Sequence, residues 1–586
     1  MPFKVKFVAS RLMDLSSFKI GTGDRAMTES ATLSRRRKLR FYGWGYADEA
    51  LSPEEESRLR DLVKRFGSTV EILPPRETEF DLRAPRVSVP QSLAALVSIT
   101  PYDRLVHSYG KSYADIVRML MRDVRQPPDL VAFPKSETDI VAILEWASRA
   151  NVAVIPFGGG SSVAGGVEPD VGDSYSGTVS LDLQYLNRVL EIDRTSRAAR
   201  IQAGALGPEL EDQLRPHGLT LRHFPQSLQL STLGGWIATR SGGHYASLYT
   251  HIDDFVESTR MVTPAGTLQT RRLPGSGAGP SPDRLVIGSE GILGVIVEAW
   301  MRLQDRPVHQ ASASVSFANM ATATSAVRAL SQSGLFPTNC RLLDAAEAKN
   351  NGVGDGTTAV LVLGFESADH PLAPWMARAL ELVGDHGGQF DAEAVARSLA
   401  PSSGSQEHRQ GPAGRWRNAF IRMPYYRDHM VAMGVITDTF ETAITWDRFE
   451  NLYDGVREKT LAAIHKICGQ DAGISCRFTH IYPDGPAPYF SYSALGSANG
   501  RLPDALARWR EIKLATNEIV VSLGGTVTHH HAVGRDHRSG YEMQSPPLFR
   551  AALSSAKKTL DPAGILNPGV LIDPADRKVG IRGALG

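Results

Sequence analysis

Pro156-Phe157-Gly158-Gly159-Gly160-Ser161-Ser162 is the stretch on which the interpretation of this chain depends. It directly follows Val152 to Ile155, an apolar run that predicts a buried strand, and further glycines continue to Gly166. Backbone N–H groups bind phosphates well, and glycine lets the chain approach them closely. The loop has neither the Gly-Lys-Ser/Thr of a P-loop nor the spacing of a G-x-G-x-x-G fingerprint. Taken alone, it fits a phosphate-binding loop and an ordinary tight turn equally well.

Two further glycine-rich stretches lie downstream of this loop. One runs from Gln226 to Gly242 and the other from Ile287 to Ile296. Each offers backbone amides and small hydroxyl side chains next to an apolar helix or strand, so the stretches could together line one long dinucleotide. We therefore predict the following cofactor-binding residues: Pro156, Phe157, Gly158, Gly159, Gly160, Ser161, Ser162, Gln226, Ser227, Leu228, Gln229, Leu230, Ser231, Thr232, Thr239, Arg240, Ser241, Gly242, Glu290, Gly291, Ile292, Leu293, Gly294, Val295 and Ile296.

The composition is that of an ordinary globular protein. Its 586 residues exceed what one hydrophobic core usually serves, so two or three domains are expected. Hydrophobic residues make up 42% and charged residues 22% of the chain. The 64 lysines and arginines nearly balance the 63 aspartates and glutamates. This balance argues against nucleic acid as a partner and against a polybasic membrane anchor, but it leaves room for a local cationic pocket.

Cysteine usage and the absence of long apolar runs indicate the compartment. Cys340, Cys468 and Cys476 form no CxxC pair, which argues against a disulfide framework or a thiolate zinc site. No apolar run reaches the roughly 18 residues that a transmembrane helix needs. The first residues also lack the apolar core and cleavage site of a secretory signal. We therefore expect a cytoplasmic protein.

Strands and helices alternate from about residue 126 onward, which predicts an α+β fold. Ser52-Pro53-Glu54-Glu55 starts an earlier helix with a cap serine, a proline and acidic residues. A polar stretch over 401–414, rich in glycine and proline, predicts a mobile loop. We expect five segments: a poorly ordered extension over 1–34, a helical N-terminal region over 35–125, an α+β module over 126–308, a second α+β module over 309–525, and a C-terminal segment over 526–586 that returns to the first module.

The glycine-rich stretches resemble those of a known superfamily. PFGGGSSVAGG (156–166), STLGGWIATRSGG (231–243) and GSEGILGVI (288–296) have the order and spacing found in vanillyl-alcohol-oxidase, or PCMH-type, FAD-binding proteins. The resemblance implies a PCMH-type FAD-binding domain of two α+β subdomains over 126–308, with an α+β cap domain above the flavin. Some members attach FAD covalently through a histidine or cysteine near the first loop. This chain has Ser161 and Ser162 there, so we expect non-covalent FAD.

A second resemblance extends from about residue 35 to 571. It rests on RRR (35–37), YGWGY (42–46), RLLD (341–344), YRD (426–428), WDR (446–448), CR (476–477), PYF (488–490) and HHHAVG (529–534). These motifs are similar to those of the alkyldihydroxyacetonephosphate synthase family, the ether-lipid enzymes. The resemblance implies a net non-redox reaction in which a fatty alcohol replaces the fatty acid of acyl-dihydroxyacetone phosphate. It also implies that N5 of the oxidised flavin traps the C1 carbon of the substrate.

The family's substrate-binding arginine matches Arg427, and Arg341 matches a further arginine important there. A guanidinium fork suits a phosphate dianion better than an ammonium group does. Each arginine could instead form a structural salt bridge, Arg427 with Asp428 and Arg341 with Asp344. The resemblance favours the substrate-binding role.

Tyr489 stands where the family keeps its catalytic tyrosine, with Tyr492 as the alternative because the family's Tyr-Phe-Tyr-Phe is Tyr-Phe-Ser-Tyr here. The resemblance assigns substrate orientation and proton transfer to His529, His530 and His531. On a strand, His529 and His531 would share one face while His530 points away. Alternatively, His529 and His531 could be two ligands of one metal ion. No third ligand lies within a short distance of them in the sequence, so we expect no metal.

The main alternative on the same scaffold is an FAD-linked oxidase or dehydrogenase of a 2-hydroxy acid or alcohol. Such relatives carry a Gly-Glu-His-Gly-type segment where this chain has the histidine triplet, which favours the synthase. A non-catalytic flavin-binding protein is a third reading, against which the intact arginine, tyrosine and histidine positions speak. The resemblance implies lipid substrates and a homodimer. Peripheral membrane contact is a hypothesis, with 35–125 and 401–414 as candidate regions.

Overall fold

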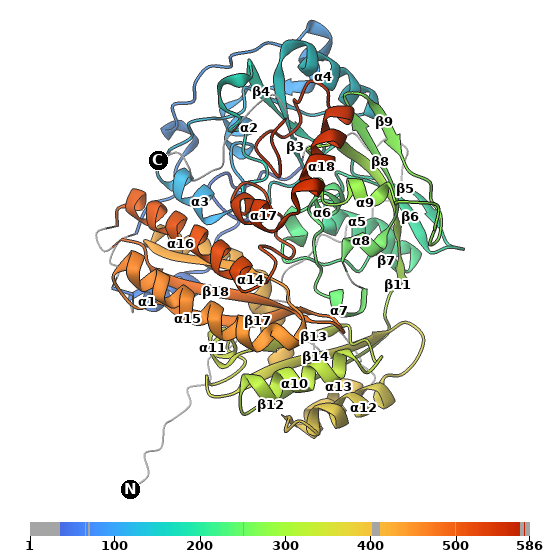
Figure 1. Cartoon of the computed structure of the whole chain (residues 1–586), viewed down its shortest axis with the longest axis vertical. Coiled ribbons are helices and arrows are strands. Elements are labelled where there is room, and N and C mark those ends of the chain that lie inside the picture. Colours follow the sequence, from blue (N-terminus) through green and yellow to red (C-terminus); the bar gives the residue numbers. More distant parts are fainter. Residues whose placement is uncertain are drawn as a thin grey trace. The chain divides into compact units, whose positions relative to one another are not determined.

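Sheets of four, five and seven strands form the framework of the protein (Figure 1), and two short strands, β7 (Leu219–Thr220) and β11 (Gln304–Asp305), form a fourth. The computed structural model describes residues 36–64, 66–67, 71–249, 251–400, 411–497, 500–574 and 579. The extension expected over 1–34 therefore lies outside the described residues, as does 401–410 of the expected loop. Gly411 already begins a helix, α14 (Gly411–Ala432), so the prediction of a loop is wrong for 411–414.

The four-stranded sheet carries the glycine loop at one end. Its order is β1 (Val97–Ser98), β2 (Leu130–Ala132), β4 (Gly177–Asp182) and β3 (Val152–Phe157), with β2, β4 and β3 parallel. Helix α4 (Glu137–Ala150) joins β2 to β3; the Ser136 hydroxyl caps its first turn, and Asn151 ends it in the left-handed conformation. The loop therefore leaves the carboxyl end of a buried parallel strand, where α/β sheets commonly bind ligands.

The five-stranded antiparallel sheet forms the other half of the same domain. Its order is β5 (Val189–Asp193), β6 (Ala198–Gln202), β10 (Val295–Arg302), β8 (Val256–Thr263) and β9 (Gly266–Gln269). Helix α6 (Leu233–Thr239) begins after Thr232, whose hydroxyl accepts a hydrogen bond from the N–H of Gly235. Side chains of both sheets belong to one hydrophobic core. The expectation of an α+β domain in two parts is confirmed.

The seven-stranded sheet belongs to the cap domain and has one apolar and one polar face. Its order is β15 (Gln389–Phe390), β12 (His309–Phe317), β14 (Ala359–Ser367), β13 (Asn339–Leu343), β17 (Gly473–Ile481), β18 (Pro486–Leu495) and β16 (Val435–Glu441). Helices α10 (Met320–Ser331), α12 (Ala373–Gly384), α15 (Phe449–Cys468) and α16 (Leu502–Ser522) bury the apolar face in a second core. The expected α+β cap domain is thus confirmed.

The C-terminal segment, which contains α17 (Arg538–Gln544) and α18 (Pro547–Leu560), lies against the first sheet (red in Figure 1). The N–H of Val154 donates to the carbonyl of Ile565 at 2.8 Å, and the N–H of Asn567 donates to the carbonyl of Val154 at 2.9 Å. The N–H of Arg535 donates to the carbonyl of Ala164 at 2.8 Å, within the glycine loop. Backbone hydrogen bonds therefore join the last part of the described chain to the loop.

The N-terminal region packs on both domains. Its helices are α1 (Pro53–Lys64), α2 (Pro101–Val106) and α3 (Tyr113–Leu120), joined by long irregular segments. The reciprocal hydrogen bonds of a capping box, 2.9 and 3.2 Å long, connect Ser52 and Glu55 at the start of α1. Helix α3 lies in the cap core, whereas Trp44, Leu59 and Val63 pack with Tyr425 and Val435. The region thus ties the domains together.

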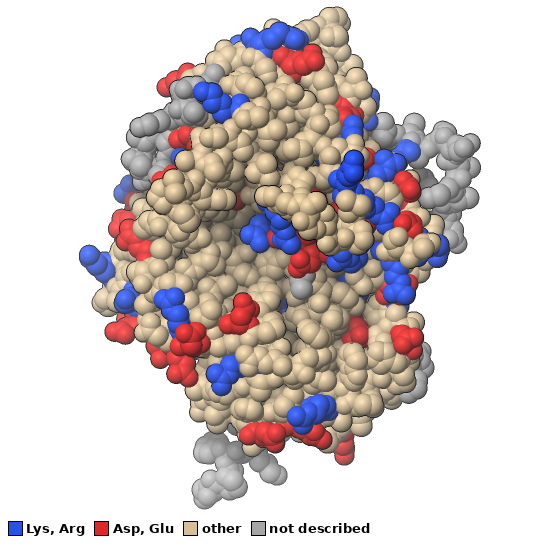
Figure 2. Space-filling view, turned by 45° about the vertical axis from the view of Figure 1, so that its right-hand side comes forward, with Lys and Arg blue, Asp and Glu red and all other residues tan. Residues whose placement is uncertain are grey.

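On the face drawn in Figure 2, most basic side chains lie near acidic ones, and much of the face carries neither. All three cysteines are free thiols, and Cys340 and Cys476 are buried. Among the described helices, none combines the length and apolar character required to cross a bilayer.

Asp129 links the N-terminal region to the four-stranded sheet. Its fully buried carboxylate accepts hydrogen bonds from Arg83, from Arg86 and from the N–H of Thr178, the last at 2.7 Å. Burial alone would raise its pKa, but the hydrogen bonds from Arg86 and Arg83 hold the pKa at about 2. The stabilisation is therefore fully present above the ordinary pKa of an aspartate and is lost as the pH falls to about 2.

We expect Asp129→Asn to reduce stability by about 1.5–3 kcal/mol at neutral pH, because the fully buried carboxylate loses its charge-assisted hydrogen bonds to two partly exposed guanidinium groups. Thermal melting monitored by circular dichroism between pH 2 and pH 7 measures this, and the difference from the wild type should shrink toward pH 2. Asp123→Asn, which removes a salt bridge to the exposed Arg125, is the matched control and should change stability by less than about 0.5 kcal/mol. Equal melting of the Asp129 variant and the wild type at pH 7 would contradict the expectation.

Candidate functional site

The glycine loop presents a row of backbone donors. In the described part of the chain, no group accepts a hydrogen bond from the backbone N–H groups of residues 159–162. A Cβ atom at Gly159 would overlap the carbonyl oxygen of Leu230, and one at Gly158 would overlap the hydroxyl of Thr232. The loop is therefore pressed onto the second predicted stretch. Successive unpaired N–H groups after a buried strand form a concave site for an anion such as a pyrophosphate.

The third predicted stretch also meets this loop. Gly291 has a positive φ of 77°, and a Cβ atom there would lie 3.0 Å from the ring of Pro156. The three stretches, which are far apart in the sequence, thus converge at the carboxyl end of β3. This convergence is what a long dinucleotide would require.

Several predicted cofactor-binding residues use their side chains elsewhere. The carboxylate of Glu290 accepts hydrogen bonds from the N–H groups of Val533 and Gly534, at 2.8 and 2.7 Å. Burial raises the pKa of Glu290 to about 7. The guanidinium of Arg240 pairs with Asp253 at 2.8 Å. Five side chains belong to hydrophobic cores, so their contribution to a cofactor site is limited to the backbone: Leu230, Ile292, Leu293, Val295 and Ile296.

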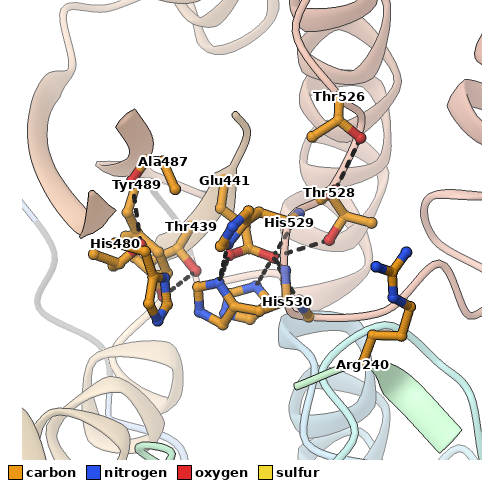
Figure 3. A network of polar contacts seen from close by, with 12 residues as sticks. Arg240, Thr439, Glu441, His480, Ala487, Tyr489, Thr526, Thr528, His529 and His530 are labelled. Atoms are coloured by element: carbon orange, nitrogen blue, oxygen red, sulfur yellow. Dashed lines mark hydrogen bonds and ion pairs between the residues drawn. The ribbon is translucent and has the colours of Figure 1, made fainter. Parts of the chain in front are cut away.

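The histidine triplet lies in a bend and not on a strand, so the expectation of alternating faces is wrong. One oxygen, Oε1 of Glu441, accepts hydrogen bonds from the backbone N–H groups of His529, His530 and His531, at 3.1, 2.6 and 2.6 Å. The hydroxyl of Thr528 donates to the same oxygen at 2.9 Å. Because three consecutive N–H groups converge on one atom, the chain cannot be extended there. Figure 3 shows His529 and His530 beside this carboxylate.

A chain of ring contacts continues from the triplet toward the FAD-binding domain. Nδ1 of His529 lies 3.0 Å from Nδ1 of His530, and Nε2 of His529 lies 3.0 Å from the Tyr482 hydroxyl and 3.2 Å from Nε2 of His251. Burial lowers the pKa of His529 well below its ordinary value and that of His531 to about 4. These two imidazoles are therefore neutral at pH 7 and can accept a proton.

Tyr489 lies in a polar row that crosses three strands. It pairs with Arg477 on β17 and with Glu441 on β16, so the three side chains share one face of the sheet. The Arg477 guanidinium lies 3.9 Å from the centre of the Tyr489 ring, and the Tyr489 hydroxyl donates to Thr439 at 2.9 Å. Burial raises the pKa of Tyr489, which keeps its phenol protonated.

The alternative, Tyr492, is three residues further along the same strand and therefore faces the opposite way. Its ring packs against Phe440 in the core of the cap domain, with 6.2 Å between the ring centres. The ring of Tyr489, by contrast, lies 5.4 Å from that of His531. Only Tyr489 of the two thus shares a face with the polar row and reaches the triplet.

Arg427 lies beside Lys111, close to the glycine loop. Its guanidinium donates to the carbonyl of Lys111 at 2.7 Å and contacts Asp428 at 3.4 Å, so the structural salt bridge is present but long. Nζ of Lys111 donates to the carbonyl of Arg40, and the N–H of Lys111 donates to the carbonyl of Ser162 at 2.6 Å. Burial lowers the pKa of Lys111 to about 8.

Arg341 is placed on β13, nearly fully buried. Burial, with the nearby charge of Arg477, lowers its pKa to about 9. Asp344, the salt-bridge partner considered from the sequence, is bound instead by Arg457 at 2.9 Å and by the N–H of Cys476. The two predicted substrate arginines thus occupy different surroundings, Arg427 beside Lys111 and Arg341 beside Arg477.

Two groups of side chains have their ligand atoms close enough to hold a metal ion. One is His480, His529 and His530, and the other is Glu441, His530 and His531. Neither is the pair of His529 and His531 considered from the sequence, and each takes a ligand from the cap sheet. Glu441 and His480 could not be recognised as candidate ligands from the spacing of residues in the sequence, because they are about 90 and 50 residues from the triplet.

Sequence reasoning missed Glu441, His480, His251, Tyr482 and Lys111. Glu441 reaches the site because β16 pairs with β18 in the register that sets it beside Tyr489. His480 follows the Cys476-Arg477 motif on β17 by three residues. This closeness in the sequence was the one signal that could have pointed to His480. No local pattern marks the others.

Comparisons with known proteins agree with this geometry. The model of the FAD binding domain matches residues 128–271, and that of the C-terminal domain of FAD linked oxidases matches 306–571. The chain is 32% identical to an alkyldihydroxyacetonephosphate synthase of Dictyostelium discoideum, over 80% of this chain and 77% of the relative. It is 27% identical to one of Caenorhabditis elegans, over 92% and 96%. A solved structure of an alkyldihydroxyacetonephosphate synthase matches with a TM-score of 0.74 and 26% identity, covering 91% of this chain and 98% of the other.

We expect Gly159→Ala to abolish flavin binding, because the added methyl group collides with the Leu230 carbonyl and displaces the N–H groups of the loop. The ratio of flavin absorbance to protein absorbance after gel filtration measures this. Gly277→Ala, at a position with no atom within 4 Å of the added Cβ, is the control and should keep full flavin content. A flavin-loaded Gly159→Ala protein would refute the assignment of the loop.

Proposed function

The chain belongs to the alkyldihydroxyacetonephosphate synthase family of FAD-linked enzymes, and from this premise we propose that it exchanges the acyl chain of acyl-dihydroxyacetone phosphate for a fatty alcohol, forming an ether bond. The observation that carries the proposal is the row of Arg477, Tyr489 and Glu441 on the polar face of the cap sheet. This row meets the histidine triplet next to Gly242 of the second FAD stretch, where a Cβ atom would lie 3.5 Å from that of His530. A donor, several bases and the cofactor segment therefore converge.

FAD, when bound, supplies the electrophilic N5 atom that holds the substrate carbon while its substituent is exchanged. The residues present fit this cofactor, since the unpaired N–H groups of residues 159–162 suit its pyrophosphate. We propose that FAD is held non-covalently, because Ser161 and Ser162 stand where other members of the superfamily carry a histidine or cysteine. The side chains proposed below act around this cofactor.

The substrate phosphate requires cationic donors. Arg427 supports this role because it stands beside Lys111 and Arg40 at the edge of the glycine loop. Nε of Arg427 has no hydrogen-bond partner among the described residues, which leaves a donor free for a ligand. A guanidinium fork binds a phosphate in a defined orientation, and the buried ammonium of Lys111 adds charge. We propose Arg341 as a second substrate-binding arginine on the side of the site nearer Arg477.

Proton transfer is proposed for Tyr489 and for the triplet. The reaction removes a proton from C1 of the substrate and another from the alcohol, so it needs groups that exchange protons near neutral pH. Burial makes the neutral imidazoles of His529 and His531 weak bases, so we propose that they accept a proton only transiently, while the protonated Tyr489 can donate one. His530 lies between them and next to Glu441.

The proposal extends to the surroundings of the enzyme. Both substrates carry long hydrocarbon chains that reside in membranes, which supports transient contact with a membrane surface. On the resemblance to the family, we propose a homodimer. A cytoplasmic location is proposed from the cysteine usage.

We expect the purified protein, incubated with palmitoyl-dihydroxyacetone phosphate and hexadecanol, to form the alkyl ether and release palmitate, as measured by mass spectrometry. Because the reaction is redox-neutral, an artificial electron-acceptor dye should not be reduced. Acid precipitation should leave the FAD in the supernatant, as expected for a non-covalent cofactor. Dye reduction by a 2-hydroxy acid without any ether product would overturn the proposal in favour of an oxidase.

Tyr489→Phe is expected to lower kcat by about 10²-fold or more, because it removes the hydroxyl that donates a proton beside the triplet and leaves the ring in place. Tyr492→Phe, which deletes a hydroxyl on the opposite face of the same strand, is the matched control and should keep kcat within about twofold. Flavin content should be unchanged in both variants. The reverse order of effects would assign the role to Tyr492 instead.

A further inference from the structure

Glu441 is a buried carboxylate that contacts the histidine triplet in two ways. It ends β16, and its side chain is almost fully removed from solvent. Oε1 accepts the three backbone N–H groups of the triplet and the hydroxyl of Thr528. Oε2 makes an ion-pair contact with Nδ1 of His530. One side chain thus holds both the backbone of the triplet and one of its imidazoles (Figure 3).

This carboxylate has an unusual set of partners. Among the described residues its ion pairs are with His530 and His531 alone, without a lysine or arginine. Glu347, another buried glutamate, pairs instead with Arg477 at 2.6 Å. Burying a carboxylate is costly unless hydrogen bonds and a counter-charge compensate it. For Glu441 the backbone N–H groups supply the hydrogen bonds, and Nδ1 of His530 contacts the second carboxylate oxygen.

The backbone around the triplet is shaped by this contact. Three successive N–H groups can point at one oxygen only if the chain curves tightly, and Ala532 directly after the triplet takes a positive φ of 75°. Such a conformation is strained for a residue with a side chain and persists where the surroundings hold it. The curvature turns all three imidazoles toward the cap sheet, whereas a strand would send every second one away.

We propose that Glu441 is the positioning residue of the histidine triplet, holding its backbone through Oε1 and placing a negative charge against the imidazole of His530 through Oε2. In the exchange, the proton leaves the C1 carbon or the alcohol, binds the imidazole and later returns to a leaving or product oxygen, so the protons balance. Glu441 itself stays ionised and touches neither substrate nor flavin. The inference rests on the proposed function for the chemistry, but its geometric part is independent of it.

The electrostatics agree with this role. Although burial favours the neutral acid, the contact with His530 holds the pKa of Glu441 well below its ordinary value. The carboxylate therefore stays charged through the neutral pH range. The other titratable or charged groups that face the pair come from the histidine loop, the cap sheet, α16 and the FAD-binding domain: His529, His531, His480, Tyr489, Asp438, Lys513, Tyr482 and His251.

The test separates the two parts of the role with two variants of the FAD-loaded enzyme. Glu441→Gln keeps an oxygen that accepts the N–H groups but removes the charge, and Glu441→Ala removes both. Hydrogen exchange followed by mass spectrometry reports the protection of the amides of 529–531. We expect protection to remain in Glu441→Gln and to be lost in Glu441→Ala.

The charge is tested by activity and by flavin absorbance. Glu441→Gln should lower kcat by about 10²-fold while leaving KM for the acyl-dihydroxyacetone phosphate within about twofold. Since the triplet adjoins Gly242, titration of the cluster should also perturb the spectrum of bound FAD. The midpoint of that change should move to lower pH by about one unit or more in Glu441→Gln, because a nearby carboxylate favours a protonated imidazole.

Glu211→Gln is the matched control. Glu211 is also buried, and its Oε1 accepts the N–H of Leu221 at 3.0 Å and the hydroxyl of Thr220 at 2.9 Å, within the FAD-binding domain. Its variant should keep the kcat and the flavin titration of the wild type.

The outcomes separate the inference from the proposed function. A Glu441→Gln enzyme with wild-type kcat and an unshifted flavin titration would overturn the role of the charge. Unchanged protection of 529–531 in Glu441→Ala would overturn the role in holding the backbone. If the wild type forms no ether, the proposed function fails, while the amide protection and the flavin titration still decide the role of Glu441.

Discussion

The architecture depends on backbone hydrogen bonds between the glycine loop and the returning C-terminal segment. The N–H of Arg535 reaches the carbonyl of Ala164, and Asn567 reaches β3 itself. The carboxylate of Glu290 also accepts hydrogen bonds from the N–H groups of Val533 and Gly534. These contacts place residues 529–531 at the edge of the cofactor loops, although the triplet is more than 350 residues from the first loop. They bring the triplet to a boundary where the FAD-binding domain and the cap domain also meet directly, through His251 and Tyr482.

The second constraint is the two-sidedness of the cap sheet. Alternation along β16, β17 and β18 sends Phe440, Cys476 and Phe490 into the core. The same alternation sends Arg477, Tyr489 and Glu441 to the opposite face. The register of these strands therefore builds the polar row and the hydrophobic core together, and a slip of one residue would exchange them.

Buried charge at this site is balanced mainly by oriented backbone groups. Glu441 and Glu290 each accept consecutive N–H groups, which compensate a carboxylate without bringing in a mobile cation. Meanwhile the imidazoles nearby remain neutral, because burial lowers the pKa values of His529 and His531. When an imidazole of the triplet takes up a proton, the carboxylate of Glu441 is already in place as its counter-charge. Low local dielectric strengthens such pairing, provided that every polar group is satisfied.

The sequence by itself determined what depends on local pattern: the α+β fold, the capped helices at Ser52 and Ser136, the three glycine-rich stretches, and the resemblance that assigned Arg427, Tyr489 and the triplet. Only the tertiary structure decided which atoms meet. It showed a bend where alternation on a strand was expected for His529 to His531, placed Tyr492 in the core, and brought Glu441 and His480 to the triplet. Helix caps and glycine turns are set by neighbours a few residues apart. Strand register and the return of the C-terminus join residues tens to hundreds of positions apart, and no local pattern encodes that distance.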